Sequence, residues 1–497
     1  MTELMAVDYI IAGIVGLYLV GMLAVGVWAT RETNSTADFL IAGKRFGIWA
    51  VAFSAFASIM SGFGFIGGPG LFYQGGYAFL WIAIAAPLAF PISWFVLGKK
   101  MRLMAEVREI LTIPDAAYAR YNSNAVRGLT AVSVLLGVIS YLAVQLKAMG
   151  FVLSEIIGTS QFVALLIAVG VIAVYTVGGG MIAGVMTDLV QGVVMVIGSI
   201  VVFAITLNYG GGLEQMSRDI AVNDPTFAGA FGSFPVMLVL CWYFLFTIGN
   251  SGQPHMAHKL YMVRDVKLLK WGAPIAGLSY FASSLMMLGI GISVRASVET
   301  GGMAALENAD AAAPFFLTNV TPPVIAGVVF AAALGAIMST SDAFINIGAA
   351  NMARDIPESL GYEFNSDSQE LWAHRIAAAS IIVGSLLLAY YAQILVGLLG
   401  VVGWALLAST TLPLLGIGLN WDGASREGAL AAVAVSLVLN LGLAVAGEFV
   451  GFTLPNGVVI GAFTLVVSSI TLIVVSFMTS SSAREQIATD IHRVVTS

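Results

Sequence analysis

Two of the long apolar segments in this sequence are interrupted by small and polar residues. The first interruption runs from Ala57 through Gly64 to Gly70, and the second runs from Gly249 to Pro254. A broken helix leaves backbone groups without partners, which is tolerated at membrane depth only where protein buries them or they line a watery cavity. The pair therefore predicts a binding site built from discontinuous helices.

Composition places the chain in a membrane. Of its 497 residues, 59% are hydrophobic and 10% are charged, and the mean hydropathy is +0.95, whereas soluble domains carry roughly 25% charged residues. The single cysteine, Cys241, excludes an internal disulfide framework and a cysteine-based zinc site. The first apolar stretch follows acidic residues and lacks a small-residue cleavage site, so we interpret it as a retained span.

The hydropathy pattern predicts an all-α integral membrane protein with about 13 transmembrane helices. Each apolar stretch is near or above the ~20 residues that cross a bilayer. The expected spans lie near residues 8–29, 47–72, 77–98, 124–157, 161–178, 187–208, 234–254, 272–294, 321–353, 372–393, 395–419, 428–446 and 456–478.

Basic residues predict the orientation, because short cytoplasmic loops collect lysine and arginine. With the N-terminus outside and the C-terminus in the cytoplasm, 18 of the 21 basic residues, Lys259 among them, fall in inner loops or the tail. Only Arg218 and Arg295 fall in outer loops, and Lys147 lies within a span. We therefore expect a multi-pass protein of the inner (plasma) membrane.

The two breaks occupy equivalent places in this topology. When the first span is set aside, the next ten form two groups of five, and each group begins with a broken segment. Because five is odd, the second group enters the membrane from the opposite side, as inverted repeats do. The expected regions are 1–45 (extra helix and loop), 46–210 and 230–420 (the repeats), and 421–497 (extra helices and tail). The alternative is that these glycines only allow close helix packing.

The first break predicts a neutral cage for a small cation such as Na⁺. Ala57 and Met60 could offer two carbonyl oxygens where the helix unwinds. On the ninth span, Ala336, Ser339 and Thr340 put one carbonyl and two hydroxyls on a single turn. The alternative is that these hydroxyls bond back to their own helix.

Several motifs resemble the sodium/solute symporter family. The most specific is Tyr175-Thr176-Val177-Gly178-Gly179-Gly180, followed by Thr187-Asp188-Leu189-Val190-Gln191 at the start of the next helix. Gly252-Gln253-Pro254-His255 and the turn from Ala336 to Thr340 match as well. The resemblance covers nearly the whole chain and implies a leucine-transporter-like fold of 5+5 inverted repeats plus flanking helices. It also implies that the sodium site falls on Ala57, Met60, Ala336, Ser339 and Thr340.

Two acidic residues are candidates for a second cation site or a release path. Asp188 lies near the inner end of the sixth span, and a carboxylate inside a membrane is a functional candidate by default. The resemblance implies that it lies on the sodium release route, whereas the alternative is a helix N-cap by Thr187 or Asp188. Asp342, two residues after Thr340, could join Asp188 or face a cytoplasmic water path.

The solute is expected between the two breaks and the fourth span. The candidate residues are Ser61, Phe63, Gly64, Tyr141, Gln145, Lys147, Phe246 and Asn250. Lys147 could pair with a solute carboxylate, or it could extend its ammonium to the outer interface. Tyr141 resembles a substrate-site tyrosine of the proline transporters, and other stretches resemble the pantothenate and monocarboxylate branches, all of which carry a carboxylate.

These features together predict a sodium-coupled symporter that imports a small carboxylate-bearing solute by alternating access. The chain is not expected to be an enzyme, because its four histidines were placed in inner loops and the tail. A transporter-like membrane sensor, or a symporter for a sugar or another neutral solute, remain the alternatives. We expect Na⁺, the solute and the lipid bilayer as partners, with no nucleic acid and no obligate protein partner. The solute, the number of sodium ions, proton coupling and the oligomeric state stay open.

Overall fold

The structure is a computed structural model that describes residues 8–32, 46–108, 110–362, 364–391, 396–479 and 487–497. Apart from one isolated bridge between Phe46 and Val263, the regular elements in these ranges are helices. The first half comprises α1 (Tyr9–Glu32), α3 (Ile48–Gly62), α4 (Gly68–Gly75), α5 (Leu80–Ser93), α6 (Lys99–Val107), α7 (Ile113–Tyr121), α8 (Asn124–Ile157), α9 (Gln161–Tyr209) and α10 (Leu213–Ala221). The second half comprises α11 (Val236–Gly249), α12 (Pro254–Tyr261), α13 (Leu269–Glu299), α14 (Ala312–Asn319), α15 (Pro323–Ala350), α16 (Ile356–Ser359), α17 (Asp367–Tyr391), α18 (Val396–Thr411), α19 (Arg426–Val450), α20 (Ile460–Met478) and α22 (Thr489–Val495).

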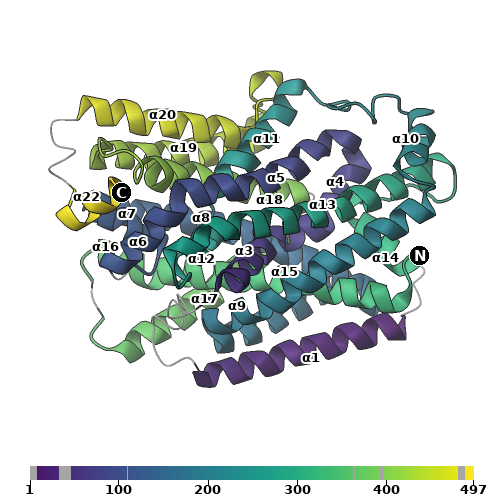
Figure 1. Cartoon of the computed structure of the whole chain (residues 1–497), viewed down its shortest axis with the longest axis horizontal. Coiled ribbons are helices and arrows are strands. Elements are labelled where there is room, and N and C mark those ends of the chain that lie inside the picture. The colour runs from purple at the N-terminus through teal and green to yellow at the C-terminus, as the bar shows by residue number, and fades with distance from the viewer. Residues whose placement is uncertain (1–7, 33–45, 109, 363, 392–395, 480–486) are drawn as a thin grey trace.

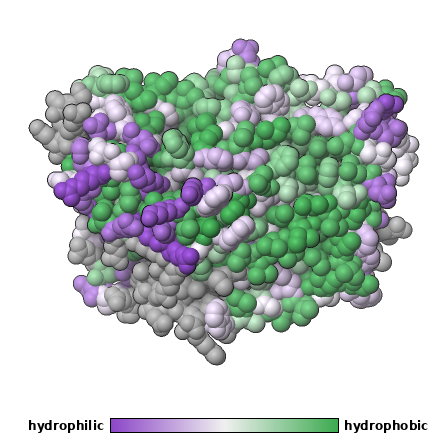
Figure 2. Space-filling model, in the orientation of Figure 1, coloured by the Kyte–Doolittle hydropathy of each residue, from purple (hydrophilic) through white to green (hydrophobic). Residues whose placement is uncertain are grey.

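Most of these helices run along one direction of the molecule. In Figure 1, α1 begins at the right-hand end and α22 lies at the left-hand end, so the described chain starts and finishes at opposite ends of the bundle. Figure 2 shows hydrophobic side chains over the middle of the same face, with hydrophilic ones gathered toward the two ends. This is the arrangement of a bundle that crosses a membrane along its long direction.

Ten helical stretches of the described residues are long and apolar enough to cross a membrane. One of them, Ile48–Val107, contains two of the expected spans, and shorter apolar helices, Tyr9–Val25 and Gln161–Ala173, coincide with the first and fifth. The prediction of an all-α membrane protein is confirmed.

The expected turn between the fifth and sixth spans lies inside one continuous helix, α9. This helix has 49 residues, which at ~1.5 Å per residue is about 74 Å and far exceeds the ~30 Å hydrocarbon core. Both expected spans lie within α9, as the apolar stretches Gln161–Ala173 and Thr187–Tyr209. For most residues of the Tyr175–Gly180 motif, the structure describes the backbone and not the side chain.

Burial separates the central helices from the peripheral ones. In the most apolar stretches of Pro323–Ser359 and Gly400–Ile417, 83% of the residues are buried, whereas 22% are buried in α19. The helices α15 and α18 therefore form the centre of the bundle, and α19 lies at its lipid-facing edge. Both broken segments pack against this centre.

An ion network holds the end of the bundle near α7 and α16 together. Arg127, at the start of α8, lies 2.6 Å from Asp115 of α7 and 3.2 Å from Asp355, which follows α15. All three side chains are buried. Burying these charges is tolerated because each one faces an opposite charge, and the network fixes α7 and α8 relative to α15.

Candidate functional site

The first broken helix departs from helical geometry at Ser61. This residue has φ 47° and ψ −173°, an unusual conformation for a residue other than glycine, and it is fully buried. Its hydroxyl accepts the N–H of Phe63 at 3.2 Å, and the N–H of Gly62 donates to Oε1 of Gln145 at 2.8 Å. Side chains therefore take part in satisfying both N–H groups at the break, and a π-helical turn, Phe63–Gly67, leads into α4.

The second broken helix changes direction between α11 and α12. A 3₁₀ turn, Asn250–Gly252, is followed by Gln253 in an extended conformation, and α12 then starts at Pro254. The amide of Gln253 donates to the carbonyl oxygen of Trp404 at 3.1 Å. A Cβ atom at Gly252 would lie 2.7 Å from Cα of Ala408. Glycine is therefore required here for the close approach of this break to α18.

The cation candidates come together where α15 crosses the first break. The hydroxyl of Thr340 lies 2.9 Å from the carbonyl oxygen of Ser58 and 2.8 Å from that of Ala336, so it can donate to either. The buried Oγ of Ser339 has no hydrogen-bond partner among the described residues. Ala57 is fully buried beside Ser58, and the carbonyl of Met60 accepts the N–H of Phe63. Neutral oxygens of this kind suit a small monovalent cation.

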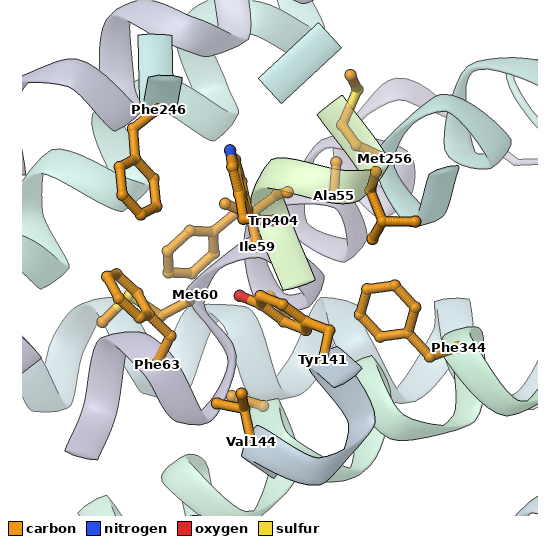
Figure 3. Packing of buried hydrophobic residues seen from close by; sticks show 14 of the residues in the cluster. Ala55, Ile59, Met60, Phe63, Tyr141, Val144, Phe246, Met256, Phe344 and Trp404 are labelled. Carbon is orange, nitrogen blue, oxygen red and sulfur yellow. The ribbon is translucent and has the colours of Figure 1, made fainter. Parts of the chain in front are cut away.

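Aromatic rings from four elements surround the first break. Phe63 stacks on Phe246 with ring centroids 5.4 Å apart, and Trp404 lies 5.1 Å from Phe246 and 6.2 Å from Tyr141. Figure 3 shows these rings facing one another, with the hydroxyl of Tyr141 directed toward the side of Met60 and Phe63. That hydroxyl lies 3.3 Å from Oγ of Ser61. The group joins α8, α11, α18 and the first break into one apolar site with a polar edge.

Gln145 brings a polar side chain of α8 to the first break. It is fully buried, and its Oε1 accepts the N–H of Gly62. Its Nε2 has no hydrogen-bond partner in the part of the chain that the structure describes. A buried amide donor without a partner costs free energy, so it offers a ready donor to a ligand acceptor beside Tyr141.

Three of the solute candidates do not join this group by any contact that we observe. The amide of Asn250 donates to Oγ of Ser93 at 2.8 Å, on α5. A Cβ atom at Gly64 would lie 2.7 Å from Sδ of Met60, so this glycine is packed against a side chain. Lys147 is half-buried, and Asp310 is the charged group that stabilises its ammonium.

Asp188 and Lys259 form a buried ion pair. The Nζ atom of Lys259 lies 3.2 Å from Oδ2 of Asp188 and 2.6 Å from Oγ of Ser54. The Ser54 hydroxyl donates to the same carboxylate oxygen. Lys259 and Asp188 are 1% and 0% exposed. The pair joins α12 to α9, and Ser54 adds α3.

The helices that carry this pair correct one expectation and exclude one alternative. Lys259 does not lie in an inner loop, because the helix that begins at Pro254 continues to Tyr261 and carries it into the protein. Asp188 does not cap a helix, because α9 is continuous through it. The hydroxyl of Thr187 bonds back to the carbonyl of Gly184 at 2.9 Å.

Asp342 lies on the same side of the cage as Asp188. A Cβ atom at Gly184 would lie 3.5 Å from Oδ2 of Asp342, and Gly184 precedes Asp188 by one helical turn. The amide of Asn346 donates to Oδ1 of Asp342 at 3.2 Å. Asp342 therefore faces α9 near Gly184, and it follows Ser339 by three residues in α15.

Several residues of the site were missed from the sequence. Trp404 sits in a uniformly apolar segment, where nothing local distinguishes a pocket residue from a packing residue. His255 and His258, expected in a loop, are buried in α12. Lys259 could have been found, because it falls five residues after Pro254, inside any helix that starts there.

Comparisons with known proteins agree with the fold. A sequence model of the Sodium:solute symporter family matches residues 39–436. The chain is 28% identical to the sodium/pantothenate symporter of Escherichia coli (strain K12) over 446 residues, covering 88% of this chain and 91% of that protein. It is 26% identical to the osmoregulated proline transporter OpuE of Bacillus subtilis (strain 168), covering 87% of each. The solved structure of a Na⁺-coupled sialic acid symporter, 20% identical, superposes with a TM-score of 0.76 over 94% of this chain and 98% of that one.

Proposed function

This chain belongs to the sodium:solute symporter family, and on that basis we propose that it carries a small carboxylate-bearing solute into the cell together with Na⁺. Sodium-coupled symport and a multi-pass membrane location come with the family. The solute class is the proposal. Its candidates are a monocarboxylate, pantothenate, and proline or another amino acid.

The sodium site that we propose consists of the carbonyl oxygens of Ala57, Met60 and Ala336 and the hydroxyls of Ser339 and Thr340. The contact between Thr340 and Ser58 supports it, because it already joins the two helices that the ion would bridge. The unpartnered Oγ of Ser339 supplies a further free acceptor. Sodium would replace the hydroxyl–carbonyl contacts with ion–oxygen contacts and hold the first broken helix against α15.

The single observation that carries the solute class is that Nε2 of Gln145 has no hydrogen-bond partner among the described residues. Nε2 of Gln145 is a buried donor beside Gly62, where a helical segment starts after the break. The N–H groups at a helix N-terminus attract negative charge. We infer that a carboxylate binds Gln145 and the hydroxyls of Tyr141 and Ser61, while its apolar part packs on Phe63, Phe246 and the newly found Trp404.

The remaining candidate residues are proposed to support the pocket or the ion path without binding the solute directly. Gly64 and Asn250 support the two breaks, Gly64 by packing on Met60 and Asn250 by its hydrogen bond to Ser93. Lys147 stays a candidate for attracting an anionic solute from outside, although Asp310 already faces it. Asp188 and Asp342 are proposed for the path by which sodium leaves.

The proposed direction of transport is inward, by alternating access. The N-terminus is placed outside and the C-terminus in the cytoplasm, from the excess of basic residues on one side. The sodium gradient and the membrane potential, about 2.3 kcal/mol per charge per 100 mV, drive the cycle. Sodium favours the state that binds the solute. After sodium and solute leave on the cytoplasmic side, the empty transporter returns to the outward-facing state.

Uptake into proteoliposomes tests this function. Radiolabelled proline, pantothenate and lactate are supplied outside under an inward Na⁺ gradient, with a K⁺ gradient and a proton gradient as controls. We expect uptake of at least one of them with Na⁺ only, and competition by the free acid but not by its amide. Uptake of a sugar instead, or competition by the amide equal to that by the acid, would contradict the carboxylate proposal. Sodium-dependent binding without uptake would favour a sensor.

A further inference from the structure

The Asp188–Lys259 pair lies one helical turn from the proposed sodium site. Ser54, which contacts both charged groups, precedes Ser58 by four residues in α3. Asp342 follows Ser339 by three residues in α15. Residues three or four apart lie on the same face of a helix. An ion that moves from the cage toward the Arg127 end of the bundle therefore meets Asp342 and Asp188 next.

A second sodium ion at this place would need a carboxylate whose negative charge is not already balanced by another cation. Oδ2 of Asp188 already accepts from both Lys259 and Ser54, whereas Oδ1 has no hydrogen-bond partner among the described residues. A departing Na⁺ can therefore contact Oδ1. It cannot settle there, because the ammonium 3.2 Å from the other oxygen repels a second positive charge where little water screens it.

We propose that Lys259 is a tethered cation that fills the second cation position at Asp188, so that the transporter binds one sodium ion per cycle. This inference rests on the proposed sodium site, and it decides between the two roles considered for Asp188. The carboxylate serves as a transit point for the ion and holds none at rest.

The ammonium also belongs to the second broken helix. Lys259 is carried by α12, the segment that follows the second break, whereas Asp188 is carried by α9. A shift of α12 relative to α9 would separate the two charged groups. The pair thereby links the state of the second broken helix to the exit of sodium from the first.

Binding of radioactive Na⁺ to the purified full-length protein tests the proposal. The number of ions bound per chain is measured together with thermal shifts over a sodium titration, with choline holding ionic strength constant. We expect one ion and a single-site curve for the unaltered protein. Lys259→Met should bind two ions with a Hill coefficient that rises toward two. Lys259→Arg, which keeps the charge, should still bind one.

A double substitution separates this role from a loss of folding. Asp188→Asn combined with Lys259→Met removes both charges. The double variant should bind one ion and be more stable than either single variant. This comparison holds even when Lys259→Met alone is too unstable to purify. Two ions in the unaltered protein would overturn the proposal. So would one ion in a folded Lys259→Met, or a double variant no more stable than the single ones. Absence of any sodium binding to the unaltered protein would instead contradict the proposed function itself.

Discussion

The hydroxyl of Thr340 lies 2.9 Å from the carbonyl oxygen of Ser58, three residues before the chain leaves helical geometry at Ser61. This one contact joins the central helix α15 to the first broken helix. A cation that binds here would act on both helices at once, which is what coupling of ion binding to helix movement requires.

Removing both hydroxyls should weaken sodium binding. Ser339→Ala combined with Thr340→Ala leaves three carbonyl oxygens of the proposed five, so we expect the sodium concentration for half-maximal uptake to rise at least about tenfold (about 1.4 kcal/mol). The measurement is solute uptake against sodium concentration in proteoliposomes. Ser341→Ala is the matched control, because its hydroxyl only bonds back to Ile337 at 2.7 Å. Unchanged sodium dependence in the double variant would rule out the cage.

Gln145→Glu should weaken solute binding more than sodium binding. The substitution keeps the size of the side chain but replaces the free Nε2 donor with an acceptor that repels a carboxylate. We expect the KM for the solute to rise by ten- to a hundredfold, on the order of 1.5–3 kcal/mol for a hydrogen bond to a charged group. Uptake kinetics at saturating Na⁺ measure it. Ser140→Ala, whose hydroxyl bonds back to Leu136 in the same helix, should change KM less than twofold, and an equal effect of both would refute the assignment.

Gly252→Ala should destabilise the protein. The added methyl group would lie 2.7 Å from Cα and 2.8 Å from the carbonyl oxygen of Ala408, and backbone atoms cannot yield as a side-chain end can. Overpacking of this kind costs about 1–3 kcal/mol, so we expect a melting temperature several degrees lower in detergent. Gly170→Ala, with nothing within 4 Å of the new atom, is the control. Equal melting temperatures would show that α18 can move away.

Trp404 should contribute to solute binding through its ring. Its Nε1 donates to the carbonyl of Leu245 at 3.3 Å, so the indole is held in place between Phe246 and Tyr141. We expect Trp404→Ala to lower solute affinity about tenfold, since aromatic pairs contribute ~0.5–1.5 kcal/mol beyond their buried area. Trp404→Phe should retain most of it. Solute-induced thermal shifts measure the affinity, and equal shifts in both variants would place the solute elsewhere.

The docking of the last helix, α22, should weaken in acid. Arg108 binds Asp490 at 2.8 Å, and this hydrogen bond holds the pKa of Asp490 below its ordinary value of 3.8. A lowered pKa in the folded state stabilises docking above pH 3.8 and stops doing so as the pH falls through the lowered value. The pair is partly exposed, so its contribution is at most about 1 kcal/mol.

Spin labelling measures this effect. A nitroxide at Thr496→Cys, in a Cys241→Ser background, should become more mobile as the pH falls below about 3.8. Arg108→Gln should raise its mobility modestly at neutral pH and remove the pH dependence. A pH response that persists in Arg108→Gln would assign the docking to other contacts.

Much of the architecture could be predicted from local patterns. Hydropathy identified the membrane class, because each span must bury its own backbone hydrogen bonds in about 20 apolar residues. The breaks were found near Ser61 and Asn250, since small and polar residues interrupt the apolar runs there. The prediction that Lys259 lies in an inner loop was wrong, because α12 begins at Pro254 and includes this lysine.

The sequence by itself determined that this chain crosses a membrane many times, has two broken helices and belongs with sodium-coupled symporters. Only the tertiary structure decided which polar groups meet. Lys259 and Asp188 are 71 residues apart, Ser58 and Thr340 are 282 apart, and Trp404 comes from a helix with no distinguishing pattern. Hydropathy is a property of each segment alone, whereas the partner of a buried charge or hydroxyl depends on how distant helices pack. That packing leaves Nε2 of Gln145 without a hydrogen-bond partner among the described residues, and it pairs Asp188 with Lys259.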